Sequence, residues 1–216
     1  MVIKKTYYLL IVPIILAYFA TNGYGFIFKA AVPASCILIL SYLYQKSLKT
    51  KSDIWYVLGA FLFSILGDWF LSNKDNSFMM FAAGIALFLI AHIGYMAFAL
   101  LNGKIHKTFT AVLLIGYLLF FVFYLYPSIN DTILMVVTLL YLLISCFSMG
   151  SAAGIKLPPQ VKWFYFLGVA LILFSDTIIA LYEFAGDRSL NFLILPTYYA
   201  AHVSITFGLI SGKNKD

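Results

Sequence analysis

Charged residues are scarce in this sequence. Only 10% of its 216 residues are Asp, Glu, Lys or Arg, whereas 63% are hydrophobic. A soluble domain carries charge on roughly a quarter of its residues, and a chain of this length cannot bury so much apolar surface in its own interior. The scarcity excludes an ordinary soluble fold and predicts that lipid surrounds most of the chain.

Cysteine and the common catalytic motifs are also scarce. Cys36 and Cys146 both lie inside apolar stretches, where a free thiol behaves as a small hydrophobic group, so no disulfide framework is expected. The sequence has no Gly-rich phosphate loop, no HExxH pair and no CxxC. Ser175 precedes Asp176 without the G-x-S-x-G setting of a serine hydrolase.

What the sequence does contain is a series of apolar runs long enough to cross about 30 Å of hydrocarbon. Short connections rich in Gly, Asn, Pro and Lys separate them. The predicted fold is an all-α polytopic membrane protein of about eight transmembrane helices, forming a single domain over residues 1–216. The first run follows Lys4 and Lys5 and is interpreted as a retained helix, because no clean signal-peptide cleavage site follows it. The predicted spans are Tyr7–Thr21, Phe26–Gln45, Ile54–Ser72, Phe78–Leu101, Phe109–Tyr126, Ile133–Gly150, Trp163–Phe184 and Leu190–Ser211.

The net charge of +6 is distributed as single or paired lysines between the spans, which indicates membrane orientation and not a nucleic-acid surface. With eight spans, one side collects Lys29, Lys74 and Arg188 alone. Cytoplasmic loops are enriched in Lys and Arg, so we expect both termini in the cytoplasm and the chain in a bacterial inner membrane. The side with the termini collects Lys4, Lys5, Lys46, Lys49, Lys51, Lys104, Lys107, Lys156, Lys162, Lys213 and Lys215.

The spans also indicate an internal duplication. Trp55 precedes Asp68 by the same interval that separates Trp163 from Asp176, and the span after each aspartate contains an Ala-His pair. Four spans per unit would give two halves in parallel orientation, although chance similarity of apolar helices is the alternative. The predicted halves are residues 1–103 and 104–216.

Ionisable residues inside spans are costly and by default mark function. Asp68 and Asp176 lie at matched depth on helices that run in the same direction, which favours a catalytic pair; a structural helix-to-helix hydrogen bond is the alternative. His92, with Tyr95 nearby, is more typical of a satisfied core group than of a ligand. Lys29 either extends to the interface or supplies a charge that binds an anion.

A metal site built from the two aspartates, His92 and His202 is conceivable by ligand type. The helical rise, however, places both histidines nearer the cytoplasm than the carboxylates. We therefore expect no metal, and acid–base chemistry by two carboxyl groups requires no organic cofactor.

At these residues the chain resembles the YhhN family of membrane proteins. One departure from the family pattern is His202, at a position where glutamine is expected, and it argues against a required ligand or catalytic role for that histidine. The resemblance covers most of the chain in the same order. The matching stretches are Lys29 with Pro33, Leu66–Leu71, Phe81–Tyr95, Leu173–Thr177 and Pro196–Ala201.

Because characterised YhhN members are lysoplasmalogenases, the resemblance implies hydrolysis of the vinyl ether bond of a lysoplasmalogen to a fatty aldehyde and a glycerophospho-alcohol. It also implies that Asp68 and Asp176 are central. Two carboxyl groups suit this chemistry independently, as acid and base or charge stabiliser. The expected partners are a lysophospholipid substrate and membrane lipids, with no nucleic acid. The expected substrate-binding residues are Lys29, His92, Tyr95, Ser175 and Tyr198.

A transporter or a lipid-binding protein without hydrolytic activity is the competing class, because duplicated halves with charges near the midplane are common in transporters. A structural membrane protein with a core ion pair is a third. The sequence does not decide the oligomeric state.

Overall fold

The computed structural model describes residues 5–45, 48, 53–75 and 77–213, and every regular element within them is a helix. This confirms the all-α prediction. Short helices η1 (Lys5–Leu10), η2 (Phe121–Leu125), η3 (Tyr126–Ser128) and η4 (Asn191–Leu193) extend the longer ones. The longer helices are α1 (Ile11–Thr21), α2 (Phe26–Tyr44), α3 (Asp53–Ser72), α4 (Phe78–Leu101), α5 (Lys107–Phe120), α6 (Thr132–Ala153), α7 (Pro159–Ala185) and α8 (Ile194–Lys213).

Polar residues and helix breakers in the connections set these boundaries. The Asp131 carboxylate accepts hydrogen bonds from the backbone N–H groups of Ile133 and Leu134 and so caps α6. Pro159 occupies the first turn of α7, where its missing N–H costs nothing. Gly186 ends α7 in the left-handed conformation, at φ 71°.

Seven of the helical segments are long and apolar enough to cross a membrane, and the shorter apolar segment Thr6–Thr21 precedes them. The predicted spans therefore correspond to helices throughout, with the first span shorter than the rest. α5 reaches spanning length only with its continuation through η2 and η3, because its own 14 residues are too few to cross the hydrocarbon. The chain is an integral membrane protein by the length and composition of these helices.

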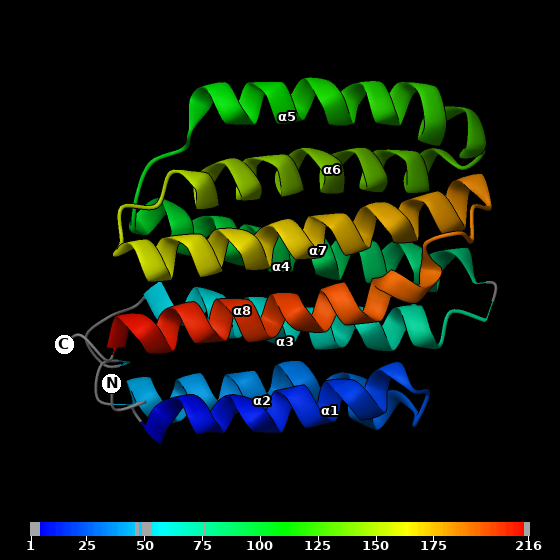
Figure 1. Cartoon of the computed structure of the whole chain (residues 1–216). Helices are drawn as coiled ribbons and strands as arrows, with labels where there is room; N and C mark the ends of the chain where they lie inside the picture. The colour runs from blue at the N-terminus through cyan, green and yellow to red at the C-terminus, as the bar shows by residue number, and fades with distance from the viewer. Residues whose placement is uncertain (1–4, 46–47, 49–52, 76, 214–216) are drawn as a thin grey trace.

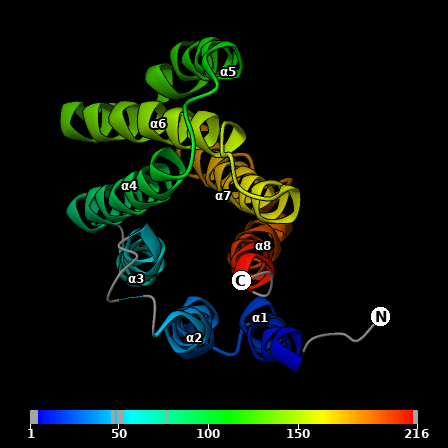
Figure 2. The same cartoon turned by 90° about the vertical axis from the view of Figure 1, so that its left-hand side faces the viewer.

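The longer helices other than α5 form a ring. Figure 1 shows them side by side with nearly parallel axes, and Figure 2, along the axes, shows α1, α2, α3, α4, α6, α7 and α8 in succession around the bundle. α5 lies outside the ring, against α6. The start of α1 and the end of α8 lie at the same end of the bundle, here called the near end; the opposite end is the far end.

The basic residues follow this polarity. Connections at the near end, and the helix ends beside them, contain Lys104, Lys107, Lys156, Lys162 and Lys213, whereas Lys29, Lys74 and Arg188 lie toward the far end. The cytoplasmic location of the termini stays a prediction, as does the duplication into halves. Part of the basic set lies outside the described residues: Lys4, Lys46, Lys49, Lys51 and Lys215.

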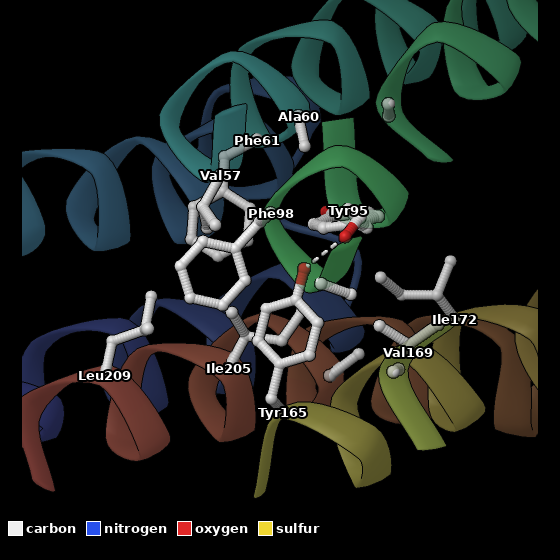
Figure 3. Close-up of a cluster of buried hydrophobic side chains, with 14 of the residues drawn as sticks. Val57, Ala60, Phe61, Tyr95, Phe98, Tyr165, Val169, Ile172, Ile205 and Leu209 are labelled. Atoms are coloured by element: carbon white, nitrogen blue, oxygen red, sulfur yellow. Dashed lines mark hydrogen bonds between the residues drawn. The ribbon is translucent and has the colours of Figure 1, made fainter. Parts of the chain in front are cut away.

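The near half of the bundle is densely packed. Its largest cluster of buried side chains comes mainly from α2, α3, α4, α7 and α8. At its centre the Tyr165 hydroxyl donates to the carbonyl oxygen of Tyr95 at 2.8 Å, and the Tyr165 ring lies 4.8 Å from that of Phe98 (Figure 3). Two connections close the same end, because the Lys156 N–H donates to the Asn102 carbonyl at 2.9 Å.

Glycine allows α7 and α8 to approach closely. A Cβ at Gly168 would collide with the Ile205 side chain and would lie 2.9 Å from the Ala201 carbonyl oxygen. Small residues at such crossings let helix backbones pack in lipid, where hydrophobicity does not drive association.

We expect Gly168→Ala to lower the free energy of unfolding by about 1–3 kcal/mol, because the added methyl group overpacks this contact. Gly116→Ala is the matched control: Gly116 lies exposed in α5 with nothing within 4 Å of its Cβ position. The control should gain up to about 1 kcal/mol from helix propensity. Thermal unfolding of both purified proteins in detergent checks this, and equal stability would contradict the close packing of α7 on α8.

Candidate functional site

The two intramembrane aspartates both lie in the far half of the bundle. Asp68 lies one turn before the end of α3, and Asp176 lies in the second half of the long helix α7. Each lies close enough to the other for a charge–charge interaction. Their surroundings nevertheless differ, and each is held by a separate set of partners.

Asp176 belongs to a hydrogen-bonded cluster that joins three helices. Its Oδ2 accepts a hydrogen bond from the Tyr141 hydroxyl of α6 and lies 3.4 Å from Nε2 of His92 in α4. The Tyr141 oxygen lies 3.0 Å from the same His92 nitrogen. Tyr141 has one hydroxyl proton, which it donates to the carboxyl group, so His92 must carry its proton on Nε2 to avoid facing two acceptors. His92 is 1% exposed, and its Nδ1 has no partner among the described residues.

Asp68 is held from the other side of the bundle. Its Oδ2 accepts a hydrogen bond of 2.9 Å from the Tyr198 hydroxyl of α8. Lys29, in the first turn of α2, interacts with it through charge. The Tyr198 ring packs against His202 at 4.6 Å between centroids. The His202 Nδ1 donates to the Tyr198 carbonyl at 2.9 Å, so this histidine orients the tyrosine and contacts neither carboxyl group.

A recess of about 50 Å³ opens beside Asp176, smaller than a typical small-molecule site. Asp176 and Tyr141 supply its main polar groups, and the rest of its wall is apolar apart from Thr138. A second hollow, of about 30 Å³, shares Thr138, Tyr141, Asp176 and Ala180 with the first and extends toward α5. The recess is lined by Leu71, Phe81, Ile85, Phe88, Thr138, Tyr141, Asp176, Ile179, Ala180 and Phe184.

Phe88 lies between the recess and Asp68. Its ring lines the recess, lies 6.2 Å from the Tyr198 ring, and fills the space where a Cβ of Gly67 would be. Gly67 immediately precedes Asp68, so its missing side chain gives the phenyl ring its place. Asp68 itself lines neither hollow. The two carboxyl groups therefore do not share a wall of the recess.

The other residues expected to bind substrate are distributed unevenly. His92 supports Asp176, and Tyr198 supports Asp68, as described above. Tyr95 is fully buried in the near-half core, 5.9 Å from the His92 ring, and its hydroxyl has no partner among the described residues. Ser175 donates to the Ile194 carbonyl at 3.1 Å and contacts neither aspartate. Lys29 lies on the Asp68 side and does not line the recess.

Sequence reasoning missed Tyr141. It is one of 16 tyrosines, and nothing in its local sequence distinguishes it from those that face lipid. Its position opposite Asp176 follows only from how α6 packs between α4 and α7. Among the described residues no three His, Cys, Asp or Glu side chains come together in a way that could hold a metal ion.

We expect Tyr198→Phe to lower the free energy of unfolding by about 1–3 kcal/mol, because it removes the hydroxyl that satisfies a partly buried carboxyl group. The neighbouring Tyr199 gives a matched control: it is equally buried, and its hydroxyl has no partner among the described residues. Tyr199→Phe should be nearly neutral. Denaturation of both proteins in the same detergent makes the comparison, and two equal losses would show that the Tyr198–Asp68 bond contributes nothing.

Comparison with known proteins agrees with this architecture. The sequence model of the YhhN family matches residues 26–209, from the start of α2 to four residues before the end of α8. No curated protein and no solved structure matches significantly. The family match includes both aspartates, His92, Tyr141 and Tyr198, and it covers most of the chain. This protein belongs to the YhhN family.

Proposed function

We propose that this protein hydrolyses the vinyl ether bond of lysoplasmalogens inside the membrane. The observation that carries the proposal is Asp176, a carboxyl group in the wall of an apolar recess with Tyr141 and His92 fixed on one of its oxygens. YhhN membership supports the same class of reaction. A vinyl ether is a neutral, apolar group whose cleavage begins with protonation of a carbon atom. A well-placed carboxyl group among hydrocarbon side chains therefore matches its chemistry.

The apolar lining of the site supports a lipid tail as occupant. Apart from the carboxyl group, Tyr141 and Thr138, the recess is lined by Leu, Ile, Ala and Phe side chains. The second hollow continues past Asp176 between α5, α6 and α7 with an equally apolar wall. A long alkenyl chain would thus extend on one side of Asp176 and the glycerol unit on the other, with the vinyl ether at the carboxyl group.

In the proposed reaction Asp176 delivers its proton to the outer vinyl carbon, which converts the double bond into a C–H bond and leaves an oxocarbenium ion at the inner carbon. Water adds to that carbon and gives a proton back to the Asp176 carboxylate. The resulting hemiacetal then breaks its bond to the glycerol oxygen, releasing aldehyde and glycerophospho-alcohol. Atoms balance with water as the only co-reactant, and the steps use protein groups alone.

The remaining residues act through Asp176 or through charge. Tyr141 and His92 occupy Oδ2, which leaves Oδ1 free to hold and transfer the proton. Asp68, behind Phe88, is assigned the role of charge stabiliser, because a carboxylate within electrostatic range favours an oxocarbenium ion in a medium of low dielectric constant. Tyr198 fixes the position of that charge.

We expect Asp176→Asn to lower kcat for release of fatty aldehyde by about 10²–10⁴-fold, the usual cost of losing a general acid. Asp68→Asn should lower it by about 10²–10³-fold, the usual scale for lost charge stabilisation. Aldehyde formed from a purified lysoplasmalogen by protein in detergent measures both effects.

The control is Asp187→Asn, which alters an exposed carboxylate in the α7–α8 connection that accepts a hydrogen bond from the Ser189 N–H; it should keep full activity. Wild-type activity in Asp176→Asn would remove the assignment. Lipid binding by the wild type without any aldehyde would favour the alternative of a lipid-binding protein or transporter.

A further inference from the structure

A lysine–glutamate ion pair lies beside the recess, toward the far end of the bundle. Lys74, in the connection between α3 and α4, forms an ion pair with the Glu183 carboxylate of α7. The Lys74 Nζ also lies 4.7 Å from the centre of the Phe81 ring. Phe81 and Phe184 pack together at 5.7 Å, and both line the recess. Lys74 and Glu183 therefore lie against the aromatic rim of the hollow that contains Asp176.

The spacing along α7 defines how far this ion pair is from the carboxyl group. Glu183 lies two helical turns after Asp176 on the same face, a rise of roughly 10 Å. Ile179 and Ala180 line the recess between them. A glycerol phosphate extends roughly 6 Å from ether oxygen to phosphorus at ordinary bond lengths. A lysine side chain of similar length covers the remainder, so a lipid with its ether at Asp176 brings its phosphate to Lys74.

The ion pair is suited to exchange. The Lys74 and Glu183 side chains are 29% and 21% exposed, so water reaches both. Ion pairs of this exposure contribute little to stability, whereas a phosphate offers lysine several strong acceptor oxygens. When a phosphate displaces Glu183 as the partner of Lys74, the protein thus loses little stability and gains a charge-assisted contact. Lys29, by contrast, lies with Asp68 and outside the recess.

We propose that Lys74 binds the phosphate of a lysophospholipid whose chain occupies the Asp176 recess, and that Glu183 holds the lysine at the rim until the phosphate displaces it. This inference rests on the proposed function for the choice of ligand. It adds a specificity: lipids that lack a phosphate lose the contact at the rim, although their chains fit the same walls.

The test measures binding without turnover. The probes are a lysophospholipid with a saturated alkyl ether chain and the matching alkyl glycerol without phosphate, titrated into purified protein in detergent. Lys74→Gln should weaken binding of the phospholipid by about tenfold or more and leave binding of the alkyl glycerol unchanged. Lys74→Arg should keep both affinities. Glu183→Gln should bind the phospholipid as tightly as the wild type or tighter, because the competing carboxylate is gone.

The control is Arg188→Gln, which removes another far-end cation that is exposed and stacked on the Tyr182 ring at 5.6 Å; both affinities should stay unchanged. A purely structural ion pair would make Lys74→Gln and Glu183→Gln weaken binding alike, and for both lipids; that result overturns the inference. Equal affinity of the wild type for the two lipids, or no binding of either, overturns it too.

The inference and the proposed function can fail separately. Phosphate-dependent binding through Lys74 in a protein that releases no aldehyde would sustain the binding site and refute the hydrolase. Aldehyde release with a KM that Lys74→Gln does not change would sustain the hydrolase and refute the phosphate-binding site.

Discussion

The far half of this bundle depends on one requirement: a polar side chain inside hydrocarbon has to find its partners within the protein. Asp176 meets it by drawing Tyr141 from α6 and His92 from α4 onto one oxygen. Asp68 meets it through Tyr198 of α8. Each aspartate thus bonds to a helix from the other predicted half of the chain. These contacts connect α4, α6 and α7 on one side and α3 and α8 on the other.

The two ends of the bundle differ in packing, and the difference places the site. At the near end aromatic residues such as Phe98 and Tyr165 fill the interior, and backbone hydrogen bonds link the connections. Toward the far end a recess is left between α3, α4, α6 and α7 beside Asp176. α5, outside the ring, borders the second hollow through Tyr117 and Phe120. Apolar side chains therefore line the approach to the carboxyl group.

Rigid and exchangeable interactions have separate places in this arrangement. The Asp176 cluster is nearly inaccessible to water, with its carboxyl side chain 10% exposed and His92 1% exposed. The Lys74–Glu183 pair is reached by solvent at the rim. Positioning of a proton donor benefits from buried, fixed partners, whereas recognition of a charged head group benefits from a cation whose resting partner is easily replaced.

The sequence by itself determined the surrounding medium and the fold class, and it predicted the working residues. The low charge content required lipid, the apolar runs became the helices with small shifts at their ends, and the cost of burying a carboxyl group singled out Asp68 and Asp176 as candidates. The tertiary structure alone decided which groups meet. Rotation of each helix about its axis and the order of helices around the ring arise from many weak packing contacts, among them Gly67 against Phe88 and Gly168 against Ile205. No single residue encodes them. For that reason Tyr141 was hidden among other tyrosines, Asp68 lies outside the recess that Asp176 lines, and Lys74 rather than Lys29 lies at the rim of the recess.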